Sequence, residues 1–205
     1  MRIAFFASGN GSTFQQLVDA IRLEALPAEP ALMLCSNAGA HAMERARNLN
    51  IKSVVISRKE YLNTSDHAEA LLSALSEFLI DFICLCGYME LVPPQVVAAY
   101  RHRIVNIHPA LLPAFGGKGM YGHRVHEAVL AYGARISGAT VHFVDEEYDH
   151  GPILAQQAVI VLPDDTPDTL ATRVQNVEKA LYVGALRIIT KNKFTIVERK
   201  VTLIP

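Results

Sequence analysis

Two polar side chains stand at the end of an apolar, strand-like run at residues 104–107, where they could act on a carbonyl group. Asn106 and His108 are two positions apart, so strand alternation places them on the same side of the chain. An amide N–H and an imidazole N–H can both stabilise negative charge on a carbonyl oxygen, and the imidazole can also transfer protons. Pro109 and Pro113 then fix the path of the chain away from the strand. We interpret the pair as a candidate catalytic site, with a structural histidine as the alternative.

A turn-rich acidic segment at residues 145–152 could add a carboxylate to this pair. Acidic residues gathered in one turn usually form a solvated tip, but Gly151 and Pro152 confine the backbone directly after Asp149. If the turn folds over His108, the carboxylate of Asp149 is expected to raise the pKa of the imidazole and to keep it protonated near pH 7. The sequence therefore predicts that Asn106, His108 and Asp149 act together.

A loop of small residues at positions 8–13 follows the first apolar run, residues 2–7. It opens a helical pattern, where free backbone N–H groups and the positive end of the helix dipole suit a phosphate group. The loop is neither a Walker A loop nor a dinucleotide fingerprint, because the Gly-Lys-Ser/Thr sequence and the third glycine are missing. Ser12 and Gln15 fit a capping box, so we expect the helix to begin at Ser12. The alternative is a plain strand-to-helix turn.

Three further segments have a composition or spacing that resembles a binding motif. Residues 87–94 continue an apolar run and end in two prolines, which could wall a pocket for a flat ligand or belong to the core. Residues 117–122 match the spacing G-x-G-x-x-G but do not join a strand directly to a helix, so we interpret them as a mobile lid. His123 and His126, with Glu127 beside them, resemble a metal-binding pair at helical spacing, but no third ligand is evident. We expect a polar rim there and no metal.

Alternation of strand and helix patterns predicts an α/β fold with a doubly wound, mostly parallel, Rossmann-like sheet flanked by helices. Two neighbouring strand-like runs in the second half predict an antiparallel C-terminal addition to the sheet. The expected strands are residues 2–7, 31–35, 51–56, 82–86, 104–107, 137–144 and 153–162, with an edge hairpin at 194–197 and 201–204. The first expected helix begins at Ser12, and the others span residues 40–48, 67–79, 94–100, 124–132 and 166–189.

Composition limits the classes of protein that fit. The chain has 205 residues, of which 51% are hydrophobic and 19% charged, which suits a single globular domain. A net charge of −1 gives no electrostatic case for binding nucleic acid or an acidic membrane surface. Three cysteines in apolar runs indicate a reducing compartment, and the short apolar start is neither a signal peptide nor a membrane span. We expect a cytoplasmic protein, monomeric or homodimeric.

The segments described above, taken in order, resemble the folate-dependent formyltransferases, and the resemblance extends from Arg2 to about Ile189. The histidine-proline stretch followed by Asp-x-Gly-Pro is the specific part of the pattern. The matching segments are Ser8-Gly9-Asn10-Gly11-Ser12, Gly87-Tyr88-Met89, Asn106-Ile107-His108-Pro109-Ala110-Leu111-Leu112-Pro113, Thr140-Val141-His142-Phe143-Val144 and Asp149-x-Gly151-Pro152.

The resemblance implies transfer of a formyl group from 10-formyltetrahydrofolate to the amine of glycinamide ribonucleotide in purine biosynthesis. Residues 1–107 would form a phosphate-binding half and residues 108–205 a folate-binding and catalytic half of one formyltransferase domain. Asn106, His108 and Asp149 would be catalytic. Carried over from the family, Gly11, Ser12, Thr13 and Glu178 would bind the ribonucleotide, and Met89, Glu90, Leu91, Val92, Asp145, Glu146, Glu147 and Tyr148 would bind the folate.

Three positions depart from the usual pattern of the family. Thr13 stands where asparagine is common, Glu90 where many relatives have arginine, and Lys179 where histidine usually follows the glutamate. Thr13 can still donate a hydrogen bond.

Four other functions are alternatives for this sequence. The length and the charge argue against a methionyl-tRNA formyltransferase, and a start on the first strand argues against a formyltetrahydrofolate deformylase. A sugar-nucleotide N-formyltransferase would use the same catalytic residues, and a non-catalytic folate- or nucleotide-binding protein would not need them.

Overall fold

The computed structural model describes residues 1–204, and the chain divides into two compact units, Met1–Val105 and the residues from Asn106 onward. Each unit has its own alternation of strands and helices. The predicted α/β class is confirmed: the main sheet has seven strands in the order β3-β2-β1-β4-β5-β6-β7, and β8 and β9 form a separate two-stranded sheet.

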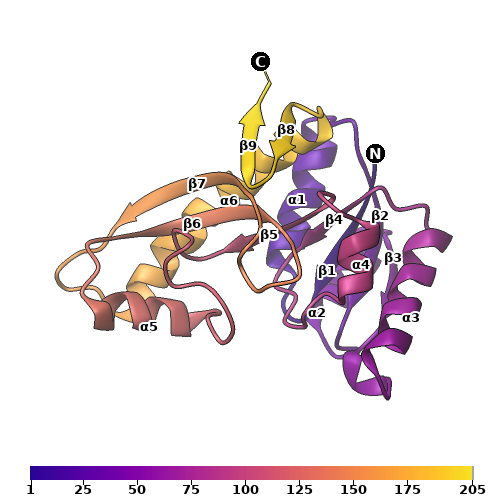
Figure 1. The fold of residues 1–205 in the computed structure, drawn as a ribbon, viewed down its shortest axis with the longest axis horizontal. Coiled ribbons are helices and arrows are strands. Elements are labelled where there is room, and N and C mark those ends of the chain that lie inside the picture. Colours follow the sequence, from indigo (N-terminus) through magenta and orange to yellow (C-terminus); the bar gives the residue numbers. More distant parts are fainter. Residues whose placement is uncertain (205) are drawn as a thin grey trace. The chain divides into compact units, whose positions relative to one another are not determined.

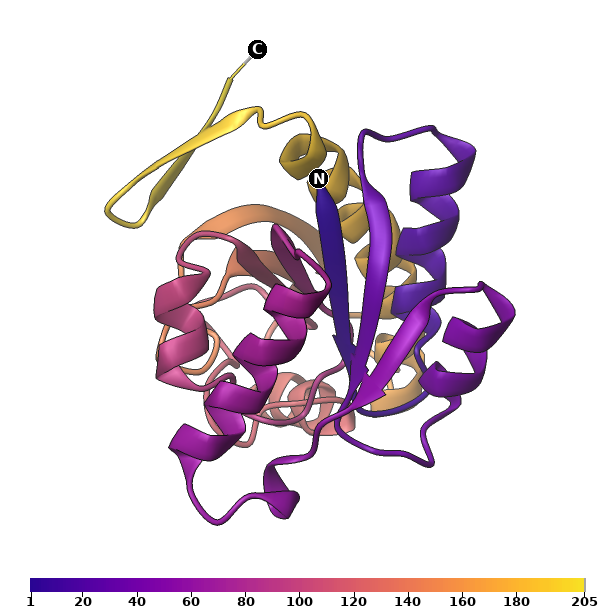
Figure 2. The same ribbon diagram turned by 90° about the vertical axis from the view of Figure 1, so that its right-hand side faces the viewer.

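In the first unit, parallel strands lie between two pairs of helices. Figure 2 shows α1 and α2 on one face of the strands and α3 and α4 on the other. β1 pairs in parallel with β2 and β4, and β2 pairs in parallel with β3. The elements are β1 (Arg2–Ala7), α1 (Ser12–Leu23), β2 (Glu29–Cys35), α2 (His41–Asn48), β3 (Lys52–Val55), the 3-10 helix η1 (Arg58–Glu60), α3 (Thr64–Glu77), β4 (Phe82–Leu85) and α4 (Pro94–Ala99).

The central strands of this unit are apolar on both faces because helices cover both faces. All four residues of β4 are buried, as are five of the six in β1. The strand order reverses between β1 and β4, so the loops that follow these two strands leave the sheet side by side. A topological switch point of this kind is where ligands bind in open α/β sheets.

In the second unit, a long antiparallel pair packs against two helices. β6 (Ile136–Phe143) and β7 (Ile153–Ile160) are antiparallel, as predicted, and Figure 1 shows α5 and α6 along one side of this pair. Apolar side chains from all four elements make up the core between them. The remaining elements are β5 (Ile104–His108), α5 (His123–Tyr132), α6 (Pro167–Thr190), β8 (Phe194–Val197) and β9 (Lys200–Leu203).

Two local expectations are wrong. α1 does begin at Ser12, but there is no capping box: its N-cap is Gly11, in the left-handed conformation at φ 74°, and no side chain caps it. The C-terminal hairpin forms as expected but is a separate small sheet, not an edge of the main one. A third difference is that α3 begins three residues earlier than expected, because the Asn63 side chain accepts a hydrogen bond from the Asp66 N–H.

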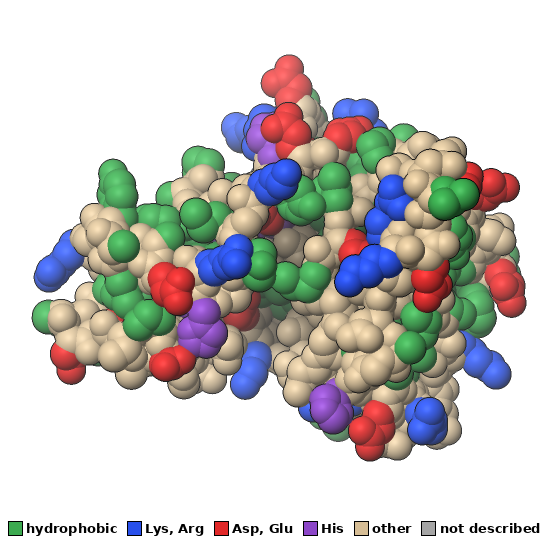
Figure 3. All heavy atoms as spheres, turned by 90° about the horizontal axis from the view of Figure 1, so that it is seen from below, with side chains coloured by type: hydrophobic (Ala, Val, Ile, Leu, Met, Phe, Trp, Pro, Cys, Tyr) green, Lys and Arg blue, Asp and Glu red, His purple; other side chains and the backbone are tan. Residues whose placement is uncertain are grey.

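Surface charge, cysteines and helix hydropathy can be compared with the expectations from composition. On the face drawn in Figure 3, Lys and Arg side chains are interspersed with Asp and Glu, as a net charge of −1 suggests. Cys35, Cys84 and Cys86 are buried and free. Among residues 1–204, no helix combines the length and the apolar character that a membrane span needs.

Candidate active site

The loop after β1 presents the start of α1 as an anion site within the first unit. Gly11 packs so closely on α2 that a Cβ atom there would lie 2.8 Å from Ala42 Cα, and its positive φ also favours glycine. Ser12 and Thr13 then open the helix, where the first N–H groups have no intrahelical acceptor. Arg45 donates two hydrogen bonds of 2.9 Å to Asn10, which brings a guanidinium beside the loop. Sequence reasoning missed Arg45, since only the fold places α2 here.

The segment after β4 is attached to the same loop through Ser8. The Ser8 N–H donates to Gly87 O at 3.0 Å, and the Met89 N–H donates to Ser8 Oγ at 2.8 Å. Met89 and Leu91 expose much of their side chains, whereas Val92 is buried. The structure therefore brings the predicted phosphate loop and part of the predicted folate segment together at the switch point of the first unit.

Glu90 turns its carboxylate into a polar cluster of the first unit. It accepts hydrogen bonds from the Arg58 N–H at 3.1 Å, the Tyr88 hydroxyl at 3.1 Å and the Ser57 hydroxyl at 3.3 Å. The ring of His67, fully buried, places Nε2 3.7 Å from the same carboxylate. Glu90 therefore fixes the backbone of the 87–92 segment, which fits a pocket lined by backbone groups.

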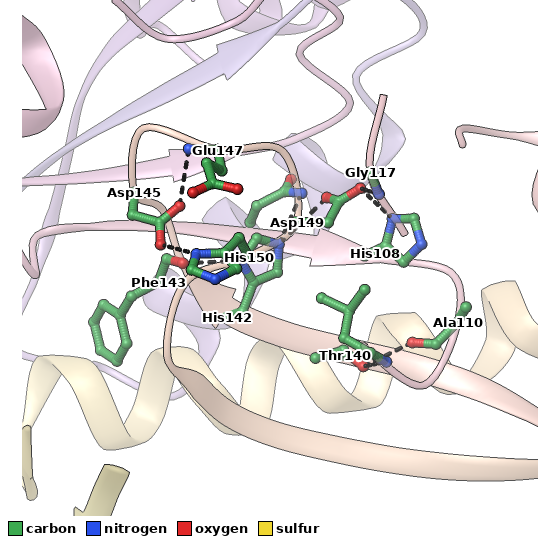
Figure 4. A network of polar contacts seen from close by, with 12 residues as sticks. His108, Ala110, Gly117, Thr140, His142, Phe143, Asp145, Glu147, Asp149 and His150 are labelled. Carbon is green, nitrogen blue, oxygen red and sulfur yellow. Dashed lines mark hydrogen bonds and ion pairs between the residues drawn. The ribbon is translucent and has the colours of Figure 1, made fainter. Parts of the chain in front are cut away.

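In the second unit, His108 and Asp149 face each other as predicted. His108 Nδ1 lies 3.4 Å from Asp149 Oδ2, and both side chains are largely buried, with exposed fractions of 3% and 11%. His108 Nε2 donates to the carbonyl oxygen of Phe115 at 2.8 Å. The Gly117 N–H donates to Asp149 Oδ2 at 3.0 Å (Figure 4), so the short segment 115–117 contacts both members of the pair.

Asn106 joins this pair through His142, a buried residue of β6 that we did not predict as a site residue. Asn106 Nδ2 lies 3.3 Å from His142 Nε2, and His142 Nε2 lies 3.6 Å from Asp149 Oδ1. His142 Nδ1 donates to the Phe143 carbonyl at 2.8 Å, so in the neutral ring Nε2 is the acceptor for the Asn106 amide. The signal was present in the sequence, because His142 lies in a matching segment.

Asp149 raises the pKa of His108 as expected, but the expectation that it keeps the imidazole protonated near pH 7 is wrong. Burial lowers the pKa of His108 below its usual value, and the Asp149 carboxylate and the Phe115 carbonyl only partly offset this effect. His108 is therefore mainly neutral near pH 7, with its proton on Nε2, where the Phe115 carbonyl accepts it.

Asp149 is held in its ionised form. Burial alone would raise the pKa of this carboxyl, but the adjacent His142 ring, the positive charge that His108 carries in acid and the Gly117 N–H together keep the pKa below its usual value. The carboxylate is therefore available as a proton acceptor at neutral pH.

The backbone of the acidic turn is fixed just beside the carboxylate. Asp149 has a φ of 52°, in the left-handed region. A Cβ atom on Gly151 would lie 1.9 Å from the Phe143 carbonyl oxygen, so no other residue fits there without displacing the strand. Asp145 accepts the Glu147 N–H at 3.0 Å, while Glu146, Glu147 and Tyr148 are exposed.

Glu178 lies on α6 and is partly buried. Burial raises the pKa of its carboxyl to about 7. Between about pH 4.5 and pH 7 the folded chain thus holds a proton that the unfolded chain has released, so stability falls as pH rises through this window.

We predict that Glu178→Gln raises the free energy of unfolding at pH 8 by ~1–3 kcal/mol, because glutamine removes the cost of ionising a buried carboxyl. Below pH 4.5 the two proteins should be equally stable. Urea unfolding at pH 8 and at a pH below 4.5 measures the difference in the free energy of unfolding. A variant that is equally stable or less stable at pH 8 would contradict the raised pKa of Glu178.

The two remaining motifs do not form a second centre. His126 is buried in the second unit, so it is not part of a polar rim, and His123 lies 3.4 Å from Asp168 on the surface. Within residues 1–204, no group of three metal-ligating side chains comes together. Residues 117–122 lead into α5 through Gly122, the N-cap of that helix.

Comparison with known proteins places this arrangement in one family. The model of the formyl transferase family matches residues 1–186. The chain is 42% identical over 205 residues to the chloroplastic phosphoribosylglycinamide formyltransferase of Arabidopsis thaliana, covering 99% of this chain and 70% of that protein. It is 36% identical to the phosphoribosylglycinamide formyltransferase of Bacillus subtilis, covering 91% of this chain and 93% of that protein.

Solved structures agree with the sequence comparison. Glycinamide ribonucleotide transformylase 1 from Symbiobacterium toebii has the same fold with a TM-score of 0.93 and 34% identity, covering 100% of this chain and 94% of that one. The corresponding protein from Geobacillus kaustophilus is 41% identical with a TM-score of 0.85, covering 92% and 98%. On these matches, the chain belongs to the formyl transferase family.

Proposed function

We propose that the chain transfers a formyl group from 10-formyltetrahydrofolate to the primary amine of glycinamide ribonucleotide. The observation that carries this proposal is a row of polar contacts: His108 to Asp149 at 3.4 Å, Asp149 to His142 at 3.6 Å and His142 to Asn106 at 3.3 Å. These four residues include no serine or cysteine nucleophile. A substrate amine can serve as its own nucleophile, so such a cluster needs only to stabilise charge and move a proton. The names of the relatives described above support the transfer of a formyl group and the ribonucleotide acceptor.

In the proposed reaction, a bond forms between the substrate amine and the formyl carbon, and the bond from that carbon to the folate nitrogen N10 breaks. His108 Nε2–H and the Asn106 amide stabilise the negative charge that develops on the formyl oxygen. Asp149, ionised at neutral pH, accepts the proton that the amine loses, and this proton ends on the folate nitrogen. For His108 to donate to the substrate, its Nε2–H must leave the Phe115 carbonyl, so the segment around Phe115 has to adjust on binding.

The remaining roles are those that the resemblance to the family implies, and the geometry of the first unit supports one of them. The start of α1, with Gly11, Ser12 and Thr13, suits the terminal phosphate of the ribonucleotide. We assign Glu178 to the ribonucleotide as well. The backbone of Met89, Glu90, Leu91 and Val92 and the turn Asp145, Glu146, Glu147 and Tyr148 are assigned to the folate. No step in this scheme requires a metal ion.

A substrate panel tests the proposal. Purified protein is incubated with 10-formyltetrahydrofolate and release of tetrahydrofolate is followed with glycinamide ribonucleotide, with an amino-sugar nucleotide, or without an acceptor. Release that depends on glycinamide ribonucleotide supports the proposal. Release without an acceptor would identify a hydrolase instead, and release only with the amino-sugar nucleotide would replace the acceptor while retaining the catalytic residues.

A further inference from the structure

The C-terminal hairpin of β8 and β9 lies beyond residue 186, where the match to the family model ends, yet it contacts the turn that carries Asp149. Arg199, at the tip of the hairpin, donates through Nη2 to the carbonyl oxygen of His150. Its Nη1 lies 2.9 Å from Nε2 of the His150 ring. His150 is the residue between Asp149 and Gly151, so the hairpin holds the backbone directly beside the catalytic carboxylate.

The His150 side chain is held between an acidic and a basic residue. His150 Nδ1 lies 2.7 Å from Asp145 Oδ2, and a carboxylate can only accept, so Nδ1 carries the proton (Figure 4). The Arg199 guanidinium lies against the same ring, with Nη1 3.1 Å from Nδ1 and 2.9 Å from Nε2. Arg199, His150 and Asp145 are thereby linked in sequence, and the arginine brings a positive charge to an acidic turn.

A ring contact supports the same attachment at the base of the hairpin. The rings of Phe143 and Phe194 have centroids 5.3 Å apart, which joins the end of β6 to the start of β8. The turn is thus held at both of its sides: by the Gly117 N–H and His142 at Asp149, and by the hairpin at His150 and Phe143.

We propose that Arg199 is a positioning residue for formyl transfer, which holds the 145–150 turn through His150 so that Asp149 and the folate-binding part of the turn keep their places. The expected change in kinetics rests on the proposed function, whereas the expected loosening of the 145–150 turn does not. Catalytic groups lose efficiency when they are displaced by about 1 Å, so a small release of the turn should be measurable.

The kinetic test compares Arg199→Ala and Arg199→Lys with Lys200→Ala. Lys200 is the exposed residue that directly follows Arg199, at the start of β9, and its side chain has no role in the proposal. Because the contact is exposed, we expect Arg199→Ala to lower kcat/KM for the formyl donor roughly threefold to tenfold. The KM for the ribonucleotide should stay within about twofold, Arg199→Lys should recover part of the loss, and Lys200→Ala should behave as the unchanged protein.

A second readout does not depend on activity. Amide hydrogen exchange in residues 145–152 should become faster in Arg199→Ala than in Lys200→Ala, while exchange in β6 and β7 stays the same. Unchanged exchange in the turn, or a loss of activity that is equal for both substrates and accompanied by a lower Tm, would overturn the inference. If the unmodified protein shows no transfer to glycinamide ribonucleotide, the proposed function fails and the exchange experiment alone decides the role of Arg199.

Discussion

Replacing His108 by alanine is expected to lower kcat for formyl transfer by roughly a hundredfold to a thousandfold, the usual cost of losing one donor to a developing oxyanion. The variant loses the Nε2–H that now binds the Phe115 carbonyl and that we assign to the formyl oxygen. It also removes the ring beside Asp149. Steady-state kinetics with both substrates measures the effect.

The control for this variant is binding of the folate in the absence of turnover. His108 is a donor at the reacting carbonyl and makes no part of the pocket that we assign to the folate, so the dissociation constant should change little. A variant that folds, binds the folate and retains more than about a tenth of kcat would contradict the role of His108.

Asp149→Asn is expected to lower kcat at pH 7 by roughly a hundredfold, with a modest change in substrate affinity, because the amide cannot accept the amine proton. The amide oxygen can still accept the Gly117 N–H, so the turn should remain in place. The substitution also removes the negative charge that raises the pKa of His108 against the effect of burial. The pKa of His108, already below its usual value, should therefore fall further.

Two measurements check this prediction. The pH–rate profile of the variant should shift relative to the unmodified protein, and NMR of labelled histidine should report a lower pKa for His108 itself. An unchanged profile together with an unchanged His108 pKa would rule out the coupling between His108 and Asp149.

The strand and helix patterns were sufficient to predict the class of fold. Buried strands such as β1 and β4 are apolar throughout because helices cover both faces, and the long helix α6 carries a clear start signal, with Thr166 as N-cap and Pro167 after it. The trio Asn106, His108 and Asp149 could be proposed because strand alternation and the Gly-Pro turn restrict where these side chains can point.

Other features depend on contacts that no local pattern encodes. The N-cap at Gly11 is set by the close approach of α2, which prevents any larger residue there. The net pKa of His108 depends on how deeply the tertiary structure buries the ring, so the sequence alone indicated only the effect of Asp149. The contact between Arg199 and His150 joins residues 49 positions apart on two irregular turns, where neither helix nor strand periodicity applies.

Transfer of a labelled formyl group tests the central claim most directly. The donor is prepared with an isotopically labelled formyl carbon, and the products formed by the unmodified protein and by His108→Ala are compared by mass spectrometry. The account predicts labelled formylglycinamide ribonucleotide and an equal amount of tetrahydrofolate with the unmodified protein, and at most about a hundredth of that rate with His108→Ala. Label recovered as free formate, or equal transfer by both proteins, would contradict it.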